Sequence, residues 1–161
     1  MQVKNIIDED FVNYKRPSMF IATCYCDWKC CKEANLPIST CQNCDIVSQP
    51  NINISADKIF RRYITNPITK AVCIGGLEPL LQSNDILLLI RLFRERGVND
   101  DFVIYTGYYE YEIQTFINII KHDFTNIIVK FGRYIPNQKP HYDEVLGIDL
   151  ASGNQKGVKI C

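Results

Sequence analysis

Apolar residues gather into short runs along this chain, and polar or glycine-containing turns separate them. Four of the runs have the length of strands and are rich in β-branched and aromatic residues. The predicted strands are residues 19–23, 70–74, 102–105 and 126–131.

Three other segments place their apolar residues on one face of a helix. The first begins after Ser55, a residue type favoured at helix N-caps, and Pro67 stops it. The second spans residues 83–96 and is closed by Gly97, and the third spans residues 110–122. Strands and helices therefore alternate, which predicts βαβ units and a largely parallel sheet in an α/β fold.

In such sheets, ligands bind where loops leave the carboxyl ends of the strands. The predicted strands end at the cysteine-rich segment 24–44, at Gly75-Gly76, at Thr106-Gly107 and at Gly132-Arg133. We expect these four turns to meet at one edge of the sheet and to form a ligand site. The stretch from 32 to 54 has little periodicity, and a loop of that length in a small domain is usually functional.

Length and charge exclude several classes of protein. The chain of 161 residues fits a single domain over residues 1–161. Its 18 Lys and Arg balance its 18 Asp and Glu, so it lacks the basic surface that nucleic acids require. No run reaches the length of a membrane span, and no signal-peptide core follows Met1. We expect a cytoplasmic protein that binds neither nucleic acid nor membrane.

Six of the eight cysteines lie between Cys24 and Cys44. In a reducing cytosol, clustered thiols are more often metal ligands or catalytic groups than disulfides. Structural zinc favours two Cys-x2-Cys pairs, and only Cys41 and Cys44 have that spacing. Thiolates on loops also hold iron–sulfur clusters, so both metals stay open on the cysteines alone, with a cluster favoured. The remaining two, Cys73 in an apolar run and the terminal Cys161, are expected to play no part.

Four short segments resemble the radical S-adenosylmethionine (SAM) superfamily. Residues 20–23 followed by Cys26-Asp27-Trp28-Lys29-Cys30 resemble the strand and cluster-binding loop that open those enzymes. Gly75-Gly76-Leu77-Glu78-Pro79 resembles their Gly-Gly-Glu-Pro segment, with Leu77 as an extra residue. Residues 105–108 and 151–155 resemble the activating proteins of anaerobic ribonucleotide reductases, which are similar in length to this chain.

The resemblance implies a 4Fe-4S cluster held by three cysteines in a Cys-x3-Cys-x2-Cys loop. Cys26 and Cys30 match the first two, but position 33 is Glu33. In the activating proteins the third ligand is commonly followed by His-Asn, so Cys41, followed by Gln42-Asn43, is the closest match. We predict Cys26, Cys30 and Cys41 as ligands, with Cys44 as the substitute for Cys41.

The same resemblance implies SAM as a second cofactor. We predict that Gly75, Gly76, Glu78, Thr106 and Asn154 bind it. The family fold is a (β/α) barrel, and a chain this small implies an incomplete one. The implied reaction is reductive cleavage of SAM to a 5′-deoxyadenosyl radical, which then generates a glycyl radical on an anaerobic ribonucleotide reductase-like partner. An electron donor such as flavodoxin or ferredoxin would reduce the cluster.

Two other functions fit the same residues. One keeps the radical chemistry but acts on a small molecule or a peptide. The other is a non-enzymatic binding module whose zinc or iron–sulfur centre only braces the long loop. Lys130 and Arg133, near a strand end, are predicted either to meet a carboxylate or phosphate or to be solvated. Metal identity separates the enzyme from a zinc-braced module, since zinc has no electron to deliver.

Overall fold

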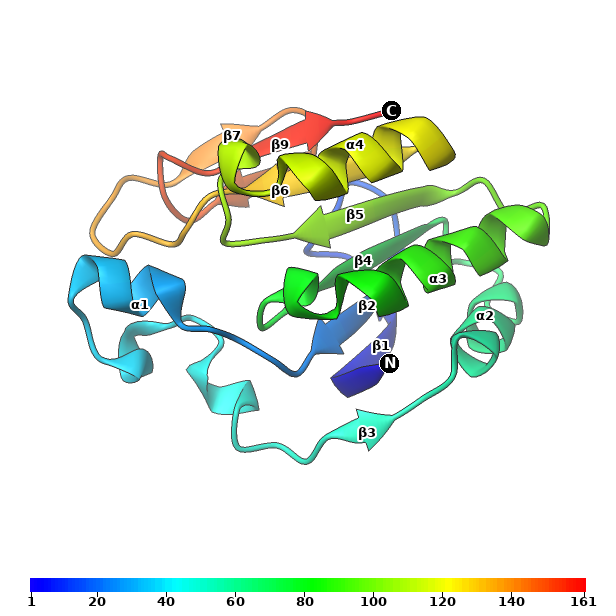
Figure 1. Ribbon diagram of the computed structural model, residues 1–161, viewed down its shortest axis with the longest axis horizontal. Coiled ribbons are helices and arrows are strands. Elements are labelled where there is room, and N and C mark those ends of the chain that lie inside the picture. Colours follow the sequence, from blue (N-terminus) through cyan, green and yellow to red (C-terminus); the bar gives the residue numbers. More distant parts are fainter.

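A mixed seven-stranded sheet runs through the protein, as a computed structural model of residues 1–161 shows (Figure 1). The strand order is β3-β1-β2-β4-β5-β6-β9. The strands are β1 (Gln2–Asp10), β2 (Ser18–Thr23), β3 (Ile52–Asn53), β4 (Ala71–Gly76), β5 (Asp101–Tyr105), β6 (Ile127–Phe131) and β9 (Lys156–Lys159).

The centre of this sheet is parallel and its edges are antiparallel. Strands β2, β4, β5 and β6 pair in parallel, and they are the four strands that the sequence predicts. β1, β3 and β9 add to them in antiparallel pairs. The α/β class and the largely parallel central sheet are therefore confirmed. The sheet ends at β3 and β9, which do not pair with each other, so no closed barrel forms.

Three helices cover one face of the sheet: α2 (Ala56–Ile64), α3 (Ser83–Glu95) and α4 (Gln114–Asp123). The larger hydrophobic core lies between them and that face. The Ser55 hydroxyl caps α2 by accepting from the backbone N–H of Lys58 at 3.3 Å, as predicted. The third helix begins later than predicted, because the 3₁₀ turn η4 (Glu110–Glu112) occupies its first residues.

The opposite face is covered by a smaller apolar cluster. Tyr14, Leu146 and Leu150 pack there against the sheet residues Cys73 and Val103. Leu150 belongs to a hairpin of its own, made of β7 (His141–Asp143) and β8 (Ile148–Leu150). None of the helices is long and apolar enough to cross a membrane.

A long cysteine-rich loop joins β2 to β3 and lies beyond the carboxyl end of the parallel strands (Figure 1). It contains the short helix α1 (Lys29–Ala34) and the 3₁₀ turns η1 (Ile38–Thr40) and η2 (Cys44–Ile46). The buried side chain of Lys4 holds the returning end of the loop, because its Nζ donates to the carbonyls of Val47 and Gln49 at 2.8 and 2.5 Å.

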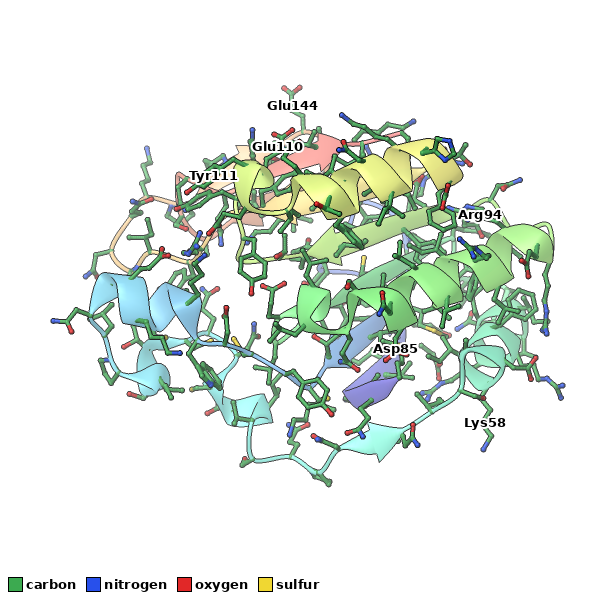
Figure 2. All side chains as sticks on the ribbon, viewed as in Figure 1. Lys58, Asp85, Arg94, Glu110, Tyr111 and Glu144 are labelled. Carbon is green, nitrogen blue, oxygen red and sulfur yellow. The ribbon has the colours of Figure 1, made fainter.

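Arg94 holds two turns at the end of the sheet opposite the cysteine-rich loop. It projects from the last turn of α3, as Figure 2 shows. Its guanidinium donates to the carbonyls of Val98, Asp100 and Thr125, at 2.8, 3.1 and 2.7 Å. These contacts fix the turns that lead into β5 and β6.

Candidate functional site

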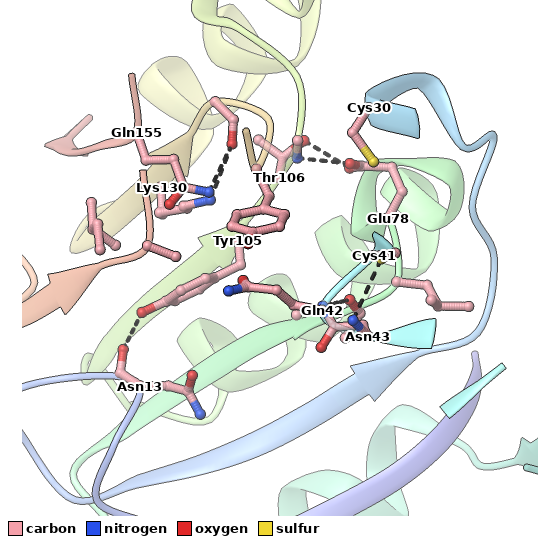
Figure 3. Close-up of a pocket in the computed structure, with 18 of the residues that line it drawn as sticks. Asn13, Cys30, Cys41, Gln42, Asn43, Glu78, Tyr105, Thr106, Lys130 and Gln155 are labelled. Atoms are coloured by element: carbon pink, nitrogen blue, oxygen red, sulfur yellow. Dashed lines mark hydrogen bonds between the residues drawn. The ribbon is translucent and has the colours of Figure 1, made fainter. Parts of the chain in front are cut away.

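A cavity of about 430 Å³ opens at the carboxyl ends of the parallel strands, a volume typical of small-molecule sites. Cys26, Cys30 and Cys41 line it, although Cys41 lies eleven residues beyond Cys30 in the chain. In Figure 3, Cys30 and Cys41 lie on the same side of the cavity as Glu78 and Asn43. The sequence predicted this convergence of distant turns, and the fold produces it.

The three thiols have polar neighbours that suit a thiolate. The Cys26 Sγ accepts from the backbone N–H of Trp28 at 3.3 Å, and the Cys41 Sγ accepts from that of Asn43 at 3.4 Å. A hydrogen bond with Cys41 lowers the pKa of Cys30 and raises that of Cys41, while burial raises the pKa of Cys26 to about 11. Backbone N–H groups thus point at two of the three sulfur atoms.

The glycine turn forms the floor of the cavity at the end of β4. A Cβ on Gly75 would lie 3.1 Å from the Phe20 ring and 3.3 Å from Cβ of Tyr105. The Gly76 carbonyl accepts from the Asn43 side chain at 2.7 Å, so this turn also holds the segment that carries Cys41. Gly75-Gly76 therefore serves both as the end of a buried strand and as a wall of the cavity.

Glu78 follows this turn and is buried within the cavity wall. Its Oε1 accepts from the Thr106 hydroxyl at 2.7 Å and from the backbone of Leu80 at 3.1 Å, and its Oε2 accepts from the backbone of Gly107 at 2.9 Å. Burial raises the pKa of Glu78 above its usual range, against these three hydrogen bonds. The carboxylate thus joins the ends of β4 and β5 even with the extra residue Leu77 before it.

A protein-family model described as a 4Fe-4S single cluster domain matches residues 15–147. The chain belongs to this family. The match spans the cysteine-rich loop, the glycine turn and all four parallel strands. No curated protein is similar enough to the chain to count as a match.

The residues of this 4Fe-4S domain fit a cluster at the cavity. All eight cysteines are free thiols, and three of them line one wall. No three Cys, His, Asp or Glu side chains are arranged to hold a single metal ion. Iron–sulfur clusters are held by cysteine thiolates, and the cavity wall contains three cysteines.

Position 33 shows how the domain departs from the Cys-x3-Cys-x2-Cys spacing. The Glu33 carboxylate does not line the cavity; its Oε2 lies 2.7 Å from Nε of Arg133. The chain then passes through η1 before Cys41 reaches the cavity. Glu33 therefore pairs with Arg133, and the third cysteine of the cavity wall comes from farther along the chain.

The other cysteines of the loop lie outside the cavity wall. Cys44 donates to its neighbour Asp45 at 3.5 Å, and Cys24 is buried, with its Sγ 3.8 Å from Nε2 of Gln82. Cys31 is also buried, with its Sγ 3.9 Å from that of Cys30. Cys73, predicted to behave as a small hydrophobe, is fully buried in the sheet.

Lys130 is the cationic side chain in the cavity wall. Its Nζ donates to the carbonyl of Gly132 at 3.1 Å, and burial lowers its pKa to about 8. The sequence left a solvated role open for this lysine, and the structure excludes it. Lys130 is the one charged residue of an otherwise apolar strand, and that single charge was the signal for a position inside a site.

The predicted cofactor-binding residues divide into two groups. Gly75, Gly76, Glu78 and Thr106 line the cavity, whereas Asn154 does not and its neighbour Gln155 does. The Asn154 side chain instead donates to the Arg133 carbonyl at 2.8 Å and to the Tyr109 hydroxyl at 3.3 Å. Other wall residues lay beyond sequence reasoning, because no motif marks them: Asn13, Tyr134, Ile148, Asp149 and Leu150.

Proposed function

We propose that this 4Fe-4S domain is a radical SAM enzyme, with the cluster on Cys26, Cys30 and Cys41 and SAM in the adjoining cavity. The main support for this proposal is that these three thiols line the same cavity as the Gly75-Gly76 turn. When bound, such a cluster supplies one electron to the sulfonium of SAM, which splits into methionine and a 5′-deoxyadenosyl radical.

The residues of the chain have the chemistry that this cofactor needs. SAM carries an amino group and a carboxylate on its methionine part. The Glu78 carboxylate and the Lys130 ammonium offer opposite charges within the cavity wall for these two groups. The missing Cβ atoms of the glycine turn let Phe20, Tyr105 and Ala22 pack closely against this part of the cavity wall.

Burial of the two charged side chains also orients them in advance. Glu78 is held by three hydrogen bonds and Lys130 by one, so neither side chain must be ordered when a ligand binds. Fixed charges of this kind favour binding, because the entropy of ordering them is already lost in the folded protein. In this proposal the protein binds and orients the cluster and SAM, and these bound cofactors carry the redox chemistry.

For the substrate, we propose a glycine residue of an anaerobic ribonucleotide reductase-like partner. The support is the resemblance of residues 105–108 and 151–155 to the activating proteins, together with the position of Ala151 and Gln155 in the cavity wall. A small electron-transfer protein such as flavodoxin or ferredoxin would reduce the cluster.

The deciding experiment is anaerobic reconstitution with iron and sulfide, followed by electron paramagnetic resonance (EPR) of the reduced protein with and without SAM. We expect a 4Fe-4S signal that shifts when SAM is added, because SAM would bind an iron that has no cysteine. Tight zinc binding without such a signal would contradict the enzyme and favour the metal-braced binding module. A signal unmoved by SAM would leave a cluster protein of another function.

Two single variants give this experiment a matched control. Cys41→Ser should abolish the signal, because it removes a thiol from the cavity wall. Cys44→Ser should leave it intact, because Cys44 lies three residues away in the chain but outside the wall. The reverse pattern would make Cys44 the third ligand.

A further inference from the structure

Helix α1 carries Cys30, yet its own sequence supports it poorly. It has six residues, its N-cap residue makes no side-chain capping hydrogen bond, and no acidic residue lies in its first turn. One side-chain contact supports its N-terminus, where the Asp27 carboxylate accepts from the backbone N–H of Lys29 at 3.1 Å. Trp28, at the N-cap, has a left-handed backbone with φ of 59°, which is unfavourable for an aromatic residue. Isolated helices this short are unstable in water, so contacts from elsewhere in the molecule must hold α1 in place.

Arg133 supplies the main contacts. Its Nη1 and Nη2 donate to the two carboxylate oxygens of Glu112 at 2.8 and 2.7 Å. On its other edge, Nη2 donates to Glu33 Oε1 at 3.0 Å and Nε lies 2.7 Å from Oε2. The side chains of Arg133 and Glu112 are only 5% and 13% exposed, whereas that of Glu33 is 49% exposed. The planar fork thus joins one buried and one half-exposed carboxylate.

Lys29 adds a second link from α1 to the same carboxylate. Its ammonium pairs with Glu112 and lies 5.4 Å from the centre of the Tyr108 ring. Lys29 and Glu33 are one helical turn apart, and they precede and follow Cys30 in α1. Both ends of the short helix are thereby tied to the segments that follow β5 and β6.

We propose that Lys29, Glu33, Glu112 and Arg133 form an ion-pair clamp that positions Cys30 and slows the loss of the cluster. Two positive and two negative charges make the clamp neutral. Ion pairs of this kind add little net stability, and in this clamp their fixed geometry would set the position of a helix of only six residues. The part of this inference that concerns the cluster rests on the proposed ligands, and the part that concerns α1 does not.

The test compares Arg133→Gln with Arg62→Gln in the full-length protein. Arg62 also binds a carboxylate, that of Asp8, but both side chains are about 40% exposed and belong to α2 and β1. We expect Arg133→Gln to release iron to a chelator about tenfold faster than wild type, because outer residues around metal ligands have effects of this size. Arg62→Gln should release it at the wild-type rate.

Three further tests separate positioning from stability alone. In the metal-free protein, Arg133→Gln should speed hydrogen exchange of residues 29–34 while exchange in β4 and β5 stays slow. Arg133→Lys, which keeps the charge but loses the fork, should restore slow iron release only in part. The reduced cluster of Arg133→Gln should also show a broadened EPR signal, because its ligand geometry is less defined.

Unchanged exchange of residues 29–34 in Arg133→Gln would overturn the clamp, whether or not wild type assembles a cluster. Unchanged iron release from a loaded protein would overturn its role at the metal. Where Arg133→Gln fails to fold, Glu33→Gln replaces it, because Glu33 is half exposed and contributes only the outer pair. Glu33→Gln should accelerate hydrogen exchange of α1 and iron release to a smaller extent. Wild-type rates of exchange and of iron release in this variant would likewise contradict the proposal.

Discussion

Gly76 lies where the backbone turns out of β4, with φ of +84°. A Cβ at this position would lie 2.9 Å from Cα of Ala22 on the neighbouring strand. Gly76→Ala should therefore lower the free energy of unfolding by at least about 1–2 kcal/mol, the cost of a left-handed backbone for a residue with a Cβ. The contact with Ala22 adds to that cost. Urea unfolding of the metal-free protein measures it.

Gly97 provides the matched control for this substitution. Its φ of +78° is similar, but no atom lies within 4 Å of the position its Cβ would take. Gly97→Ala should lower the free energy of unfolding only by the cost of the left-handed backbone, and it should leave the cavity unchanged. Equal losses of stability in the two variants would show that the approach of Ala22 contributes nothing.

At the scale of single residues, the sequence identified the chemistry of the site better than its geometry. Cys26, Cys30 and Cys41 were predicted from spacing and resemblance, and they line one cavity. The partner of Glu33 was not predictable, because Arg133 lies a hundred residues away in the chain. A contact between residues so far apart in the chain depends on how β6 pairs with β5. No local sequence pattern predicts that pairing.

At the scale of elements, the buried strands and long helices were predicted because their apolar patterns are nearly uninterrupted. β1 and β9 were missed because charged residues interrupt them, as in Asn5 to Asp10 and in Lys156 to Lys159. These two strands lie in the antiparallel outer parts of the sheet, where polar residues are tolerated. Helix α1 was missed because cysteines and charged residues stand where a helix would show a periodic apolar face.

The contact between α1 and η4 gives the protein a specific sensitivity to acid. Arg133 and then Lys29 lower the pKa of Glu112 from 4.5 to about 2. The folded state therefore keeps this carboxylate ionised at pH values where the unfolded chain has already protonated it. Its stabilising effect is complete above about pH 4.5 and is lost as the pH falls toward 2.

Glu112→Gln removes this dependence. Wild type should be the more stable protein at about pH 6, and the difference between the two should shrink markedly by about pH 3. Urea unfolding of both metal-free proteins at the two pH values measures it. A difference that stayed constant with pH would show that the Glu112 carboxylate does not titrate between folded and unfolded states as described.

At the scale of the whole molecule, the hydrophobic core and the metal-binding loop are separate. Neither of the two apolar clusters contains any of the six cysteines between Cys24 and Cys44. The metal-free protein should therefore stay folded, unlike zinc fingers, which unfold without their metal. We expect native-like circular dichroism and one cooperative thermal transition after iron is removed. Loss of that transition would mean that the cluster is needed for the core to form.

Lys4 and Asn43 have a consequence for the lifetime of the protein. Lys4 fastens the returning end of the cysteine loop to β1, and Asn43 fastens its middle to Gly76, without any help from metal. A cluster lost from the proposed site would therefore leave the loop tethered next to the cavity, where it could take up fresh iron and sulfide without new synthesis of the protein.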